Sequence, residues 1–85
     1  MKKALLVLGG GIDQVFMIKT TKEMGYLTVC VDGNPDAPGL KLSDHSKVIS
    51  YTEVNDIINY CLNLLKQGIN LSGVTTMGRD IPHII

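Results

Sequence analysis

The sequence predicts an α/β fold, with an open parallel sheet of four strands in the order 3-2-1-4 and helices on both faces. The unbroken apolar run Ala4–Leu8 is typical of a strand that is covered on both sides. Gly9–Gly11 follow it, and a helical pattern follows the glycines. A second apolar run, Leu27–Asp32, then completes a strand, helix and strand within about 30 residues, the usual length of a right-handed parallel crossover.

The first unit comprises a strand over Lys3–Leu8 and a helix over Ile12–Met24, which ends at Gly25. One face of this helix is expected to pack on the sheet and consists of Met17, Ile18, Thr21 and Met24. Ile12, Val15 and Phe16 lie on or beside the charged side of the first turns. We interpret them either as ordinary exposed apolar residues or as a corner that a ligand or another domain covers.

Residues 33–46 form the longest irregular stretch, because two prolines and two glycines preclude a long helix there. A short helical turn over Pro38–Leu42 would place Leu40 and Leu42 on the sheet. Irregular stretches of this length in small domains are usually functional.

The second half repeats the pattern, with a strand over Lys47–Tyr51 and a helix for which Thr52 is the expected N-cap. Gly68 ends this helix. Its apolar stripe comprises Val54, Ile57, Ile58, Cys61, Leu62 and Leu65. The fourth strand is expected over Leu71–Thr75, before a turn over Met77–Asp80 in which Asp80 caps a new helix.

The composition excludes several classes of protein. Eight basic and eight acidic residues cancel, so no basic patch predicts nucleic-acid binding. The apolar run after Lys3 is too short for a signal peptide, and no run is long enough to span a membrane. Cys30 and Cys61 lie in apolar patterns, which favours buried free thiols and a cytoplasmic setting. We expect one domain over residues 1–85, in a chain that is cut short because its last helix has barely begun at Ile85.

Ligands of open parallel sheets bind at the carboxyl ends of the strands, so the residues that follow each strand are the candidate site. Arg79, the one arginine in the sequence, falls at this edge, where a guanidinium suits a carboxylate or phosphate; a salt bridge that holds the turn is the alternative. The predicted substrate-binding residues are Gly9, Gly10, Gly11, Gln14, Asp32, Asn34, Gly78, Arg79 and Asp80. No catalytic residue, metal ligand or cofactor-binding residue is predicted.

A dinucleotide site is the main alternative. Asp32 lies about 20 residues beyond the glycines, where a ribose-binding acid is expected. However, the fingerprint Gly-x-Gly-x-x-Gly needs a third glycine where Gln14 stands, which disfavours NAD(P). A dimerisation module without catalytic function is a further alternative. His45 and His83 have no partners at metal-ligand spacing.

Four stretches together resemble a known family: residues 6–14 (LVLGGGIDQ), 23–39 (EMGYLTVCVDGNPDAPG), 43–44 (SD) and 73–80 (GVTTMGRD). They are similar to the N-terminal, Rossmann-like domain that precedes the ATP-grasp domains of biotin carboxylase, carbamoyl-phosphate synthetase and phosphoribosylglycinamide synthetase. The resemblance covers almost the whole chain, and the stretch Asp-x-Asn-Pro-x-Ala-Pro-Gly after the second strand is its most specific part.

The resemblance implies ATP-dependent ligation of a carboxylate to an amine through an acyl phosphate. ATP and magnesium would be held by later domains, and this domain would help to bind a small anionic substrate through its glycine turn. Alone it would not catalyse the reaction. The expected partners are that substrate and the C-terminal ATP-grasp domains, with a homodimer as an open alternative and with neither nucleic acid nor membrane.

Overall fold

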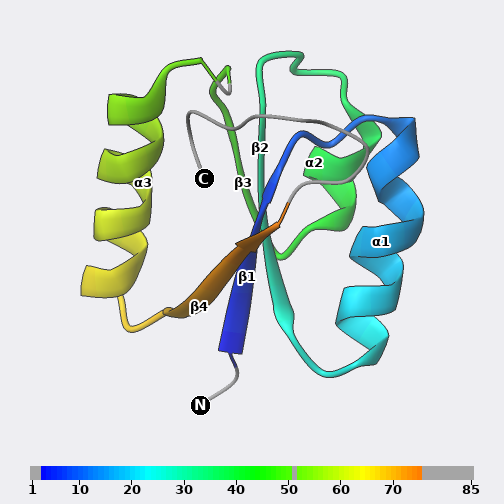
Figure 1. The fold of residues 1–85 in the computed structure, drawn as a ribbon, viewed down its shortest axis with the longest axis horizontal. Coiled ribbons are helices and arrows are strands. Elements are labelled where there is room, and N and C mark those ends of the chain that lie inside the picture. Colours follow the sequence, from blue (N-terminus) through cyan, green and yellow to red (C-terminus); the bar gives the residue numbers. More distant parts are fainter. Residues whose placement is uncertain (1–2, 51, 76–85) are drawn as a thin grey trace.

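A parallel sheet of four strands forms the middle layer of the protein (Figure 1). The computed structural model describes residues 3–50 and 52–75. The strands are β1 (Lys3–Leu8), β2 (Leu27–Asp32), β3 (His45–Val48) and β4 (Asn70–Thr75), in the order β3-β2-β1-β4. Every ladder between them is parallel. The predicted fold class and strand order are therefore confirmed.

Three helices cover the two faces of this sheet. Figure 1 shows α1 (Ile12–Glu23) and α2 (Pro38–Leu42) on one face and α3 (Val54–Lys66) on the other. Right-handed crossovers produce this arrangement, because the connection from β1 to β2 and the connection from β3 to β4 run across the sheet in opposite directions. The two directions diverge between β1 and β4, which makes the carboxyl ends of these strands the switch point of the sheet.

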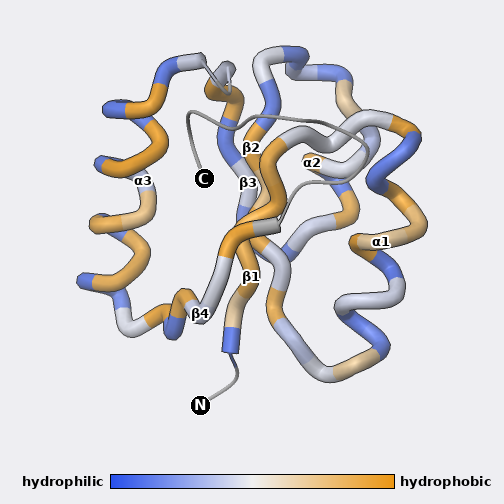
Figure 2. The backbone as a smooth tube through the Cα atoms, viewed as in Figure 1, coloured by the Kyte–Doolittle hydropathy of each residue, from blue (hydrophilic) through white to orange (hydrophobic). Residues whose placement is uncertain are grey.

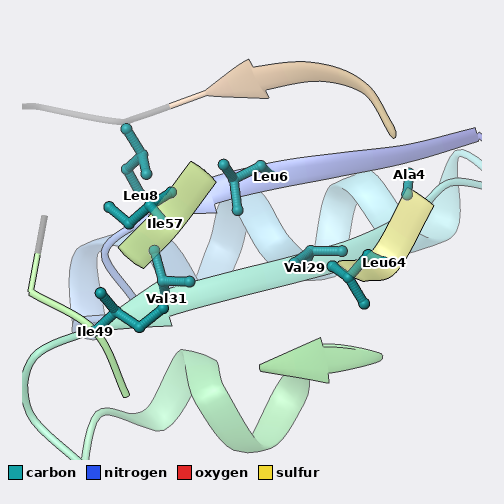
Figure 3. Close-up of a cluster of buried hydrophobic side chains, with 8 residues drawn as sticks. All are labelled: Ala4, Leu6, Leu8, Val29, Val31, Ile49, Ile57 and Leu64. Atoms are coloured by element: carbon teal, nitrogen blue, oxygen red, sulfur yellow. The ribbon is translucent and has the colours of Figure 1, made fainter. Parts of the chain in front are cut away.

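Each face of the sheet has its own apolar core. The alternation of side chains along a strand sends Leu6 and Leu8 of β1 toward α3, while Val7 points toward α1 and α2. Figure 3 shows the larger cluster, which comprises Ala4, Leu6, Leu8, Val29, Val31, Ile49, Ile57 and Leu64. The smaller cluster comprises Val7, Ile18, Cys30, Ala37 and Leu40, with Leu42 packed against it. The predicted turn over Pro38–Leu42, and its contact with the sheet, are therefore confirmed.

The region around the third strand differs from the prediction. The strand was expected over Lys47–Tyr51, but β3 spans His45–Val48, because pairing with β2 begins at Val29 opposite His45. The N-cap of α3 is Glu53 rather than Thr52, and Glu53 makes no side-chain cap hydrogen bond within the described part of the chain. The Thr52 hydroxyl instead lies 2.9 Å from the hydroxyl of Ser50.

One prediction about a buried side chain also needs correction. Met24 was expected to pack on the sheet, but it is the C-cap of α1 and is 68% exposed. The apolar stripe of α3 is wider than the sheet can cover, as Figure 2 shows by the hydrophobic colour over much of that helix. Ile57 is buried and Cys61 half-buried, but the other members of the predicted stripe are exposed: Val54, Ile58, Leu62 and Leu65.

Candidate functional site

The glycine turn between β1 and α1 is shaped by backbone bonds to β2. Gly9 adopts a positive φ of 97°, a conformation that residues with a side chain rarely accept. Its N–H donates to the carbonyl of Val31 at 2.8 Å, so the end of β1 stays paired with β2. Gly11 is the N-cap of α1 and has an extended backbone. The turn thus reverses the chain while the helix starts directly above the sheet edge.

Asp32, at the end of β2, ties the glycine turn to the loop that follows β2. The N–H of Gly10 donates to Oδ2 of Asp32 at 2.7 Å, and the N–H of Asn34 donates to Oδ1 at 2.8 Å. Both oxygens of the carboxylate therefore accept bonds from backbone amides. The sequence placed Asp32 at this edge, and the structure shows how its carboxylate is used there.

A contact between two glycines locks the same loop onto the turn. The N–H of Gly39, in α2, donates to the carbonyl of Gly10 at 2.7 Å. A Cβ atom added to Gly39 would lie 2.7 Å from Cα of Gly10 and 2.8 Å from Cδ1 of Ile18. A Cβ added to Gly10 would lie 2.7 Å from Sγ of Cys30. The two backbones can approach this closely only because neither residue carries a side chain.

This contact explains the specific stretch Asp-x-Asn-Pro-x-Ala-Pro-Gly. Asp32 closes it at one end and Gly39 at the other, while the side-chain oxygen of Asn34 accepts the N–H of Asp36 at 3.0 Å. Gly39 was part of the quoted resemblance but was not among the predicted site residues. A glycine inside a predicted helical turn was the available signal, because glycine weakens a helix unless close packing requires it.

Gln14 lies beneath the turn rather than on its open side. Its side chain is buried, and its amide group lies within 4 Å of the positions that Cβ atoms of Gly9 and Gly11 would occupy. The side chain therefore supports the turn from within the first turn of α1. Whether it also reaches a ligand stays a prediction.

The first turn of α1 presents hydrogen-bond donors at this edge. The N–H groups of Ile12 and Asp13 have no acceptor within the helix, and Gly11 has no side chain with which to cap them. The positive end of the helix dipole lies at the same point, which favours a bound anion. The carboxylate of Asp13 is in this turn too, so the edge favours an anionic ligand that also carries hydrogen-bond donors.

The predicted site also includes residues that follow β4. Thr75 pairs with Val7, so the chain leaves β4 at the same edge where the glycine turn leaves β1. Gly78, Arg79 and Asp80 follow, but they lie outside the described residues. The structure therefore brings together Gly9, Gly10, Gly11, Gln14, Asp32 and Asn34.

The thiols do not form part of this edge as reactive groups. Cys30 is buried beneath Gly10, and this burial raises the pKa of its thiol to about 11. A hydrogen bond from Ser43 lowers this pKa, and the charge of Asp32 raises it. Burial also raises the pKa of Cys61, which is half-buried rather than fully buried as expected.

Within residues 3–50 and 52–75, no three His, Cys, Asp or Glu residues cluster as metal ligands would. Of the helices in this part of the chain, none has the length and apolarity that crossing a membrane requires.

The chain resembles known proteins in its fold and in its sequence. The fold matches the crystal structure of phosphoribosylglycinamide synthetase from Anaerococcus prevotii with a TM-score of 0.68 and 28% sequence identity, over 89% of this chain and 18% of that chain. By sequence, the chain is 28% identical over 86 residues to a ribosomal RNA large subunit methyltransferase E from Methanocorpusculum labreanum, and it spans 41% of that protein. No protein-family model matches the chain.

The structural match agrees with the motifs and the strand order, whereas the methyltransferase match is one of sequence alone and partial. The chain spans less than half of either relative. Its fold and motifs are those expected of the N-terminal domain of the ATP-grasp ligases, and the match to phosphoribosylglycinamide synthetase confirms that resemblance.

Proposed function

We propose that this chain is the substrate-side domain of an ATP-dependent carboxylate–amine ligase and that it holds a small anionic substrate at the glycine turn. The observation that carries the proposal is the anchored turn itself. Gly10 is fixed by Asp32 and by Gly39, while the N–H groups of Ile12 and Asp13 remain directed at the sheet edge. A rigid set of backbone donors binds an anion without first paying the entropy of ordering a loop.

The role of each group follows from its chemistry. The backbone amides of Gly11, Ile12 and Asp13 bind the anionic group of the substrate, and Arg79 adds a guanidinium from the turn after β4. Asp32, Gly39 and Gln14 hold the turn in place. In the complete ligase the carboxylate is phosphorylated by ATP, and the amine then displaces phosphate from the acyl phosphate. ATP and magnesium bind to polypeptide outside this chain, so this domain alone is not catalytic.

A nucleotide-binding function of the NAD(P) type is the second candidate, because Asp32 lies at the end of β2. In those sites the acid accepts hydrogen bonds from ribose hydroxyls. Here both carboxylate oxygens already accept backbone N–H groups at 2.7 and 2.8 Å. A ribose would have to compete with the bonds that anchor the glycine turn, which favours the ligase proposal.

Calorimetric titration of the 85-residue protein separates the two functions. We expect saturable binding of ribose 5-phosphate, used as a phosphorylated probe, and no measurable binding of ribose. ATP with magnesium should bind negligibly. Tight binding of ATP would contradict the ligase proposal, and saturable binding of NADH would establish the dinucleotide function in its place.

A further inference from the structure

Residues 33–44 cross one face of the sheet, from the carboxyl end of β2 to the amino end of β3, and we call this segment the strap. It contains α2, which lies beside α1 in Figure 1. Hydrogen bonds connect the parts of the strap to one another. The N–H of Ala37 donates to the carbonyl of Asn34 at 3.0 Å, and the N–H of Ser43 donates to the carbonyl of Gly39 at 3.1 Å. These bonds favour movement of the strap as one unit.

The strap is joined to the glycine turn at the carboxyl edge of the sheet. The N–H of Gly39 donates to the carbonyl of Gly10 at 2.7 Å. The carboxylate of Asp32 accepts the N–H of Gly10 through one oxygen and the N–H of Asn34 through the other. The position of the glycine turn therefore depends on where the strap lies.

A second set of bonds, which we call the Asp44 contact, holds the strap at the amino edge. Oδ2 of Asp44 accepts the N–H of Thr28 at 2.8 Å and its hydroxyl at 3.2 Å, and the N–H of Asp44 donates to the carbonyl of Thr28 at 3.0 Å. Nζ of Lys22, on α1, donates to the carbonyl of Leu42 at 2.9 Å and lies 3.7 Å from Oδ1 of Asp44. Thr28 precedes Asp32 by four residues of β2, so about 13 Å of strand separates this contact from the carboxyl edge.

The middle of the strap is held less firmly than its two ends. α2 has five residues, and isolated helices shorter than about 12 residues are marginal in water. The strap contributes Ala37 and Leu40 to the smaller core, whereas the larger core on the other face contains no residue of the strap among its eight described members. Opening of the strap therefore exposes much less apolar surface than unfolding of the whole domain.

The thiol of Cys30 lies under the strap and can report when it opens. Cys30 is fully buried in the smaller core with Ala37 and Leu40. The Ser43 side chain, at the end of α2, shares a hydrogen bond with this thiol. A reagent can reach Cys30 only after these three residues have moved away.

We propose that the strap opens as one unit while the sheet stays folded, and that the Asp44 contact sets how often it opens. Each opening breaks the bond from Gly39 to Gly10, so the glycine turn keeps its bond to Asp32 but loses its second anchor. Residues at the amino edge thereby control the rigidity of a turn at the carboxyl edge. This coupling runs through the strap and does not require a change in the register of the strands.

Iodoacetamide labelling of the unmodified 85-residue protein at pH 8 tests whether the strap opens separately. Peptide mass spectrometry measures the labelling rate of Cys30, and the rate in 8 M urea provides the unfolded reference. We expect Cys30 to react at least about tenfold faster than global unfolding, measured by circular dichroism, would allow. Its rate should also depend less steeply on added urea than global unfolding does. A rate equal to the global value, with the full urea dependence, would overturn the proposal.

Variants test whether the Asp44 contact controls the opening. Asp44→Ala removes the acceptor of two bonds from Thr28 and should raise the labelling rate of Cys30 by about tenfold. Lys22→Met should raise it by about twofold, because this ion pair is partly exposed, and it provides the same test if Asp44→Ala does not fold. An unchanged rate in the folded variants would overturn the proposal.

Ile57→Val is the matched control, since it removes a methyl group from the larger core on the other face. It should lower the stability of the whole domain and leave the labelling rate of Cys30 unchanged. If the rate instead rises in proportion to the loss of global stability, the strap does not open separately.

Amide exchange at Gly39 tests the link to the glycine turn. In Asp44→Ala, exchange at Gly39 should accelerate by the same factor as the labelling of Cys30, and unequal factors would show that the strap does not move as one unit. The inference does not depend on the proposed function. No ligand is present in these measurements, so the strap can open whether or not ribose 5-phosphate binds.

Discussion

The approach of Gly39 to Gly10 makes a prediction with an unusual sign. Gly39 lies inside α2, and replacing glycine by alanine inside a helix ordinarily stabilises it by about 0.5–1 kcal/mol. Here the added Cβ would lie 2.7 Å from Cα of Gly10 and 2.8 Å from both the Gly10 carbonyl oxygen and Cδ1 of Ile18. Two of these atoms belong to the backbone and cannot rotate away.

The expected magnitude follows from these distances. Overpacking of a filled core destabilises the folded protein by about 1–3 kcal/mol. Alanine also reduces the freedom of the unfolded chain, which stabilises the folded protein by about 0.4–1 kcal/mol. We therefore expect Gly39→Ala to lower the free energy of unfolding by about 1–2 kcal/mol. For a domain of this size, that corresponds to a fall of roughly 5–15 °C in Tm.

Gly73→Ala is the matched control. Gly73 has no positive φ, and its added Cβ would meet Cδ2 of Leu5 at 3.4 Å, which is near ordinary contact. Its effect on stability should stay within about 0.5 kcal/mol. Urea unfolding followed by circular dichroism measures both variants. If Gly39→Ala is as stable as the unmodified protein, or more stable, the close approach of the two backbones is wrong.

Three further predictions concern polar and thiol groups. Asp32→Ala leaves the N–H groups of Gly10 and Asn34 without acceptors, so it should cost about 1–3 kcal/mol and accelerate amide exchange at Gly10, whereas unchanged exchange would contradict the anchoring role. Burial raises the pKa of Asp44, but hydrogen bonds from Thr28 and the charge of Lys22 outweigh it and hold this pKa below its usual value. The stability that Asp44 contributes is therefore present above pH 4 and is lost as pH falls through the lowered pKa. Urea midpoints should show that loss below about pH 4, and Asp44→Asn should reduce its size. In iodoacetamide labelling at pH 8, read by mass spectrometry, Cys61 should react before Cys30, since Cys30 is fully buried with a pKa near 11, and the reverse order would refute this assignment.

Much of the fold was accessible from the sequence because its two central strands, β1 and β2, are buried on both faces. The unbroken run of β1 and the glycines that end it locate the first strand and turn, and Pro38 places α2. The register of β3 was not accessible. His45, Ser46 and Lys47 are polar residues of an edge strand, and their place is set by pairing with β2 and by the bonds between Asp44 and Thr28.

The candidate site was accessible by position but not by role. The rule that ligands bind at carboxyl ends located Gly10 and Asp32 correctly at one edge. It could not indicate that the carboxylate of Asp32 is used to hold the turn, because that depends on the approach of Gly39 across more than 20 residues of chain. The extent of the exposed row on α3 was inaccessible for a similar reason, since the stripe does not reveal how much of it the sheet covers.

The central claim is that the anchored glycine turn binds a small anion, and chemical-shift mapping of backbone amides tests it most directly. During titration with ribose 5-phosphate, the amides of Gly11, Ile12 and Asp13 should shift together and saturate, while those of Gly68, at the opposite edge of the sheet, stay still. Shifts confined to other regions, or none at concentrations that saturate phosphate-binding sites of this kind, would contradict the claim.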